Sequence, residues 1–127
     1  MKEIIKSDNA PKAIATYSQA VKSGNTLYIS GQVAIDPKTG KVVSGGIEEQ
    51  TEQVMQNIGA ILHEAGYNYS DVVKSTCLLS DMSNYAGMNE VYGKYYHKKP
   101  PARAAFAVKE LPLNVLVEIE TIAVKNI

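Results

Sequence analysis

The sequence lacks several features that would place the protein in particular classes. Cys77 is the single cysteine among 127 residues, so no disulfide can form within the chain, which agrees with a reducing compartment. No apolar run approaches the roughly eighteen residues of a membrane span, and residues 1–6 lack the apolar core of a signal peptide. Thirteen basic residues balance thirteen acidic ones, which leaves no overall attraction to nucleic acid or anionic lipid. We therefore expect a cytoplasmic protein without a membrane partner.

Catalytic metal and phosphate motifs are also missing. His63 and His97 are far apart in the sequence, and the His63-Glu64 pair has no second histidine four positions after the first, so a metal site is not expected. No Gly-rich phosphate loop occurs. Cys77 lies in a strand-like apolar run without a nearby histidine, which indicates a buried thiol rather than a nucleophile.

The composition that remains is that of one globular domain spanning residues 1–127. Hydrophobic residues make up 45% and charged residues 20% of the chain. Helical spacing of apolar residues predicts a helix over residues 46–65 and another that starts at an N-cap of Ser83 and ends before Pro100. Apolar runs predict strands at 19–21, 26–34, 72–79, 103–108 and 115–124, with a hairpin between the first two and a turn at 36–40. The order of elements predicts an α+β fold in which two helices cover one face of a mixed sheet.

Three charged residues interrupt the C-terminal strands. The strand period of two places Glu118 and Glu120 on one otherwise apolar face of segment 115–124, and Arg103 lies among small apolar neighbours. Such charges are costly unless they are paired or face a polar cavity, so they mark a candidate ligand site. Since two helices cover only one face of the sheet, the other apolar face predicts a homo-oligomer, with the site at or near a subunit boundary.

Several motifs resemble those of a known family. They are Ala10-Pro11-Lys12-Ala13-Ile14, Tyr17-Ser18-Gln19-Ala20, Ser30-Gly31-Gln32, Asn89-Glu90-Val91-Tyr92, and the stretch from Pro101-Ala102-Arg103 through Leu111-Pro112 to Glu118-Ile119-Glu120. From end to end, the chain resembles the RidA (YjgF-type) reactive intermediate deaminases. It departs from the family's common pattern at Ala15-Thr16, where Gly-Pro is frequent, and at Ala105, where cysteine is frequent.

The resemblance implies a chorismate-mutase-like fold that assembles as a homotrimer with active sites between subunits. It also implies hydrolysis of enamine and imine intermediates, such as 2-aminoacrylate/2-iminopropanoate and 2-iminobutanoate, to 2-oxo acids and ammonia without a cofactor. By position, Arg103 would bind the substrate carboxylate and Glu118 would handle the water. The resemblance further places five residues in the cleft: Tyr17, Ser30, Gly31, Asn89 and, through its backbone amide, Ala105.

These residue types suit that chemistry. A guanidinium meets a carboxylate with two parallel hydrogen bonds and stays charged, which fixes the neighbouring C=N carbon in position. Glu118 can orient or deprotonate the attacking water and return a proton to the departing ammonia. Burial raises and a nearby arginine lowers the pKa of such a carboxyl, so the sequence leaves its resting protonation open. Glu120 is expected to have a structural role.

Other readings of the sequence remain. Arg103 and Glu118 would also suit a structural ion pair between adjacent strands. An RNA-binding endoribonuclease or translation inhibitor, an activity also described in the family, would use a surface of interleaved aromatic and basic residues: Tyr92, Lys94, Tyr95, Tyr96, His97, Lys98, Lys99 and Arg103. A non-enzymatic chaperone or regulatory trimer is a third reading.

Overall fold

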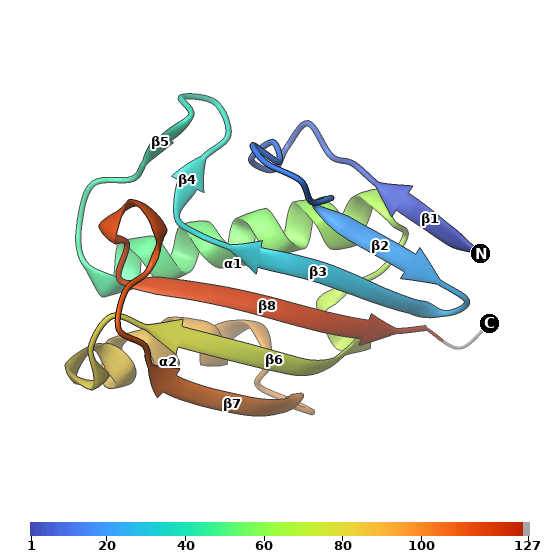
Figure 1. Ribbon diagram of the computed structural model, residues 1–127. Helices are drawn as coiled ribbons and strands as arrows, with labels where there is room; N and C mark the ends of the chain where they lie inside the picture. The colour runs from blue at the N-terminus through green and yellow to red at the C-terminus, as the bar shows by residue number, and fades with distance from the viewer. Residues whose placement is uncertain (126–127) are drawn as a thin grey trace.

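One mixed sheet and two helices make up most of the computed structural model, which describes residues 1–125. The sheet has the strand order β1-β2-β3-β8-β6-β7, and both helices lie behind it in Figure 1. β6 and β7 are parallel, and the other neighbours are antiparallel. The strands are β1 (Lys2–Ile5), β2 (Ala20–Ser23), β3 (Thr26–Gln32), β6 (Val72–Leu79), β7 (Ala102–Ala107) and β8 (Val117–Val124), and the helices are α1 (Ile47–Glu64) and α2 (Tyr85–Tyr95). The α+β fold predicted from the sequence is confirmed.

The first helix has the ends that its sequence predicts. The Gly46 backbone N–H donates to Glu49 Oε1 at 2.8 Å, which satisfies one of the free donors of the first turn. After Ala65, Gly66 adopts φ +80°, the left-handed conformation that favours glycine. The side chains of Val54, Ile58 and Ile61 are fully buried against the sheet, as the helical spacing predicts.

The start of the second helix differs from the prediction. Ser83 is not its N-cap, because an extra 3₁₀ turn, Met82–Asn84, precedes α2. The Asp81 carboxylate caps that turn by accepting a hydrogen bond from the Ser83 backbone N–H at 2.8 Å. Met88, Val91 and Tyr92 form the buried stripe of α2.

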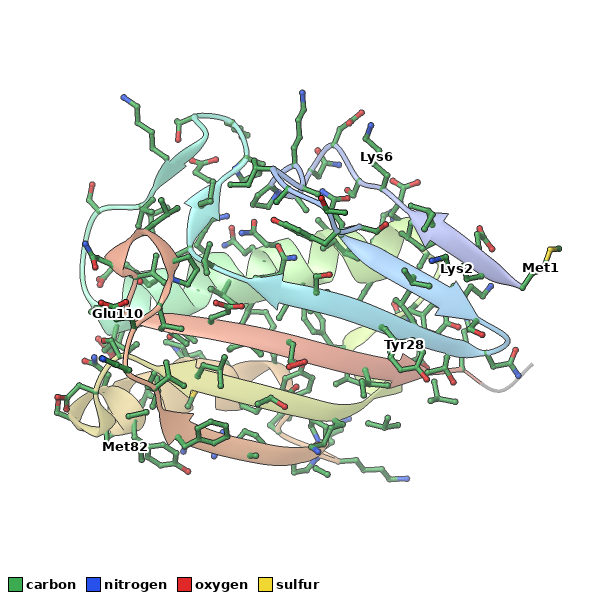
Figure 2. The ribbon with its side chains drawn as sticks, in the orientation of Figure 1. Met1, Lys2, Lys6, Tyr28, Met82 and Glu110 are labelled. Atoms are coloured by element: carbon green, nitrogen blue, oxygen red, sulfur yellow. The ribbon has the colours of Figure 1, made fainter. Side chains whose placement is uncertain are left out.

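The last strand divides its residues between the two faces of the sheet as its period of two predicts. Val117, Ile119, Thr121 and Ala123 are buried on the helix side. Glu118 and Glu120 project to the face that no helix covers, which also carries Tyr28 and Phe106, 50% and 48% exposed. Figure 2 shows Tyr28 on this uncovered face.

Two short hairpins complete the fold. β2 and β3 pair around Gly24 and Asn25, as predicted, and a second hairpin of β4 (Ile35–Asp36) and β5 (Lys41–Val42) surrounds the predicted turn. The sequence did not reveal β1, a four-residue strand with three exposed positions that pairs with β2. Neither helix in residues 1–125 has the length and hydropathy needed to cross a membrane.

Candidate functional site

Arg103 lies on the helix side of β7 and contacts α2. Its Nη1 donates to Asn89 Oδ1 at 2.8 Å, and its Nη2 donates to the Tyr85 hydroxyl oxygen at 2.6 Å. Its Cζ lies 4.9 Å from the centre of the Tyr92 ring and 5.5 Å from that of Tyr85, within the range of cation–π attraction. These contacts hold the half-buried guanidinium at the edge of the sheet.

The guanidinium keeps donors for a ligand. Arginine has five N–H groups, and two of them are accounted for by Asn89 and Tyr85. Both partners are uncharged, so the positive charge is not neutralised by them. The remaining donors and charge suit a carboxylate.

Tyr85 and Tyr92, whose rings lie beside the Arg103 guanidinium, were not among the deaminase site residues expected from the sequence, which assigned Tyr92 to the alternative RNA-binding surface. A signal was present, because Tyr85, Asn89 and Tyr92 stand at positions i, i+4 and i+7 and therefore share one helix face. Since Asn89 was already a site candidate, its helical neighbours on the same face were candidates too.

A cavity of about 460 Å³ adjoins Arg103. It lies between the C-terminal half of α2 and the segment that leads into β7. Its lining residues are Asn89, Tyr92, Gly93, Tyr96, His97, Pro100, Pro101 and Arg103. Arg103 meets this cavity on the side of Pro100 and Pro101, which precede it in the chain, and Tyr85 and Ala105 do not line it.

Ala105 lies two residues further along the same edge strand. The Val108 backbone N–H donates to Leu79 O at 2.9 Å, toward β6. Because successive N–H groups of a strand point in opposite directions, the N–H of Ala105 points to the free edge of the sheet. This orientation fits the ligand-binding backbone amide expected at Ala105.

Glu118 lies against a bulge in β3. The pairing of β3 with β8 shifts between Ile29 and Gln32, so Ser30 and Gly31 form the irregular segment. A Cβ at position 31 would lie 2.9 Å from Glu118 Cδ. Only glycine therefore leaves room for the Glu118 carboxyl here.

The surroundings of Glu118 favour its neutral form. Burial raises the pKa of this carboxyl, and the like charge of Glu120 raises it further. The sequence left open whether Arg103 lowers this pKa, and within one chain Arg103 does not contribute to the shift. Glu118 is thus a stronger base, when ionised, than an exposed carboxylate.

Ser30 precedes Gly31 in the β3 bulge, and Tyr17 lies in the loop before β2. Ser30 Oγ lies 2.6 Å from Ser18 O, to which it donates, so its hydroxyl can offer a ligand only its acceptor lone pairs. This bond joins the bulge to the loop that carries Tyr17, whose side chain is 48% exposed. The buried Gln19 side chain orders that loop by bonding the backbones of Ser7, Ala10 and Pro11.

The predicted site residues therefore form two groups, which we call the Arg103 group (Arg103, Asn89, Ala105) and the Glu118 group (Glu118, Gly31, Ser30, Tyr17). Ser75 of β6 pairs with both Arg103 and Thr121, so Arg103 is level with Thr121, three residues beyond Glu118. Three residues along a strand and two strand spacings are each about 10 Å, and the two side chains project from opposite faces. One chain does not bring the groups together, and the alternative of an Arg103–Glu118 ion pair between adjacent strands is wrong.

Three further residues considered from the sequence, Cys77, Tyr92 and Tyr96, are buried. Burial raises the pKa of the Cys77 thiol to about 11, which suits an inert core residue. Tyr92 and Tyr96, proposed for an RNA-binding surface, are 4% and 6% exposed and cannot stack on bases. Within residues 1–125 no cluster of three metal-ligating side chains occurs.

Comparison with known proteins identifies relatives over the whole length. The model of the family described as Endoribonuclease L-PSP matches residues 7–125. A RutC family protein of Pyrococcus horikoshii is 56% identical over 99% of this chain and 100% of its own. A mouse 2-iminobutanoate/2-iminopropanoate deaminase is 46% identical over 99% of this chain and 93% of its own. The crystal structure of RidA from an Antarctic Psychrobacter covers 97% of this chain and 99% of its own at 47% identity, with a TM-score of 0.93. The chain belongs to the Endoribonuclease L-PSP family, also called the YjgF/RidA family.

Proposed function

We propose that the protein hydrolyses small 2-imino acids and their enamine forms, such as 2-iminobutanoate and 2-aminoacrylate/2-iminopropanoate, to 2-oxo acids and ammonia. The observation that carries this proposal is the Arg103 guanidinium, which uncharged partners hold in place while its charge and several donors stay free. Deaminases among the relatives, such as that of mouse, support the same reaction.

The active site forms between two subunits in this proposal. The Arg103 group of one subunit meets the Glu118 group of the next, and the apolar face with Tyr28 and Phe106 is buried in the assembly. The family resemblance indicates a trimer. A monomeric mass by light scattering at micromolar concentration would contradict this arrangement.

The reaction then proceeds in two proton-transfer steps. Arg103 binds the carboxylate, aided by the Ala105 N–H, and so fixes the C=N carbon beside Glu118 of the next subunit. Glu118 takes a proton from water as the water oxygen bonds to that carbon and the C=N electron pair moves to nitrogen. It returns the proton to the nitrogen of the adduct formed from the protonated imine, and the C–N bond then breaks as the new hydroxyl group gives its proton to water, which releases ammonia and the 2-oxo acid. The raised pKa of Glu118 suits both transfers.

A trapping assay tests this proposal. A dehydratase generates 2-iminobutanoate in situ, and semicarbazide traps it. The assay measures whether the protein slows the trapping of the imine. We expect wild type to do so, Arg103→Ala to lose the effect, and Glu118→Gln to lose most of it. Arg103→Lys keeps the charge but not the planar fork, so we expect it to raise KM by about tenfold or more. Full activity in Arg103→Ala would show that the carboxylate is bound elsewhere.

A further inference from the structure

Two tyrosines flank the Arg103 guanidinium, and their hydroxyl groups have different surroundings. The Tyr92 hydroxyl is buried and has no hydrogen-bond partner within residues 1–125. Tyr92 therefore offers Arg103 only its ring. Tyr85 is half-buried, and its hydroxyl oxygen accepts a hydrogen bond from Arg103 Nη2 at 2.6 Å.

The Tyr85 hydroxyl keeps its own proton available. A phenol is one donor and also an acceptor. Because Nη2 donates to the oxygen, the phenolic hydrogen must point away from Nη2. Within residues 1–125, the bond from Arg103 is the hydrogen bond found at this hydroxyl. A free O–H donor thus lies directly beside the Arg103 cation, whose side-chain partners Asn89 and Tyr85 are uncharged.

The topology places this donor on the side of Arg103 where Ala105 lies. α2 connects two parallel strands, β6 and β7, and therefore runs opposite to β7 (Figure 1). The direction from Arg103 to Ala105 along β7 is therefore the direction from Asn89 to Tyr85 along α2. The Tyr85 hydroxyl and the edge-facing Ala105 N–H are on the same side of the guanidinium.

We propose that Tyr85 binds substrate directly: its hydroxyl accepts from Arg103 and donates its own proton to the carboxylate that Arg103 holds. This inference rests on the proposed function, because it concerns the carboxylate of the same substrate. A third donor, set at an angle to the guanidinium, fixes the plane of the carboxylate as well as its position. Loss of the hydroxyl weakens binding more than it slows the chemical step.

The test is a calorimetric titration with 2-oxobutanoate, the stable product, which carries the same carboxylate. We expect Tyr85→Phe to bind it about tenfold more weakly than wild type, the effect of losing hydrogen bonds to charged groups. Tyr95→Phe is the matched control, because it removes one hydroxyl from the same helix, where that hydroxyl bonds Glu52 instead. Its affinity should stay within about twofold of wild type. Melting temperatures of both variants check the fold.

Kinetics separate a binding role from a structural one. In the imine assay, Tyr85→Phe should raise KM by a similar factor and leave kcat nearly unchanged. Equal affinity of Tyr85→Phe and wild type for 2-oxobutanoate would overturn the inference even if wild type is a deaminase. Tyr85-dependent binding by a protein that hydrolyses no imine would overturn the proposed function and keep the inference. No binding of 2-oxobutanoate to wild type at millimolar concentration would also overturn the inference.

Discussion

Two variants that are each inactive should restore activity when their subunits are mixed. Arg103→Ala removes the proposed carboxylate anchor, and Glu118→Ala removes the proposed water-handling group. In one chain these residues lie on opposite faces of the sheet, two strands and three residues apart, or about 10 Å in each direction. A site that uses both must therefore take them from different subunits.

The size of the recovery follows from random assortment. Each boundary needs an intact Arg103 from one side and an intact Glu118 from the other. In an equimolar mixture each condition is met at half of the boundaries, so about one quarter of the sites are intact. A site contained in one chain would give no recovery at all.

The assay is to unfold the two variants together in guanidinium, refold them and measure imine hydrolysis. Each variant refolded alone is the blank, and refolded wild type sets full activity. A second mixture, of wild type with the Arg103→Ala/Glu118→Ala double variant, should keep about one quarter of the activity for a shared site and about one half for a site within one chain. Absence of recovery in the first mixture together with half activity in the second would refute the reasoning.

Two further predictions concern Glu118. Gly31→Ala places a Cβ 2.9 Å from Glu118 Cδ, so it should lower kcat by displacing the carboxyl. In the Glu118→Gln background the same change should lower the initial rate little further, which a double-variant cycle would show. Equal losses of rate in both backgrounds would mean that Gly31 acts independently of Glu118. The pKa of Glu118 is raised in part by Glu120. Because a general base must be ionised, kcat/KM falls as the pH drops through that pKa, which gives the pH profile an acid limb. Glu120→Gln removes the like charge and should move this acid limb to lower pH. An acid limb that stays in place or moves to higher pH would contradict this assignment.

Much of the fold could be predicted because its signals are local. The apolar spacing of α1, the Gly66 stop, the hairpin around Gly24 and the alternation of β8 each follow from neighbouring residues. The start of α2 was misplaced because Asp81 caps an extra turn, Met82–Asn84, that contains Ser83, and two acceptable caps two residues apart cannot be ranked from sequence. β1 was not predicted, because it is a strand through its pairing with β2 rather than through a buried apolar pattern.

The sequence and the resemblance supplied candidate site residues but not their arrangement in space. Arg103 and Glu118 stood out as charges in apolar strands, and the resemblance supplied their roles. Strand order and facing depend on pairing across the chain, so the sequence could not show that β6 separates them or that they face opposite sides. The Tyr85 hydroxyl was missed because a tyrosine in an apolar helix stripe has the same pattern whether or not its oxygen contacts an arginine.

The lifetime of 2-iminobutanoate in the presence of catalytic amounts of the purified protein tests the central claim most directly. We predict that the lifetime shortens in proportion to the concentration of wild-type protein, with 2-oxobutanoate and ammonia released in equal amounts, and that Arg103→Ala leaves it at the value in buffer. A lifetime that is independent of wild-type concentration would contradict the proposed function.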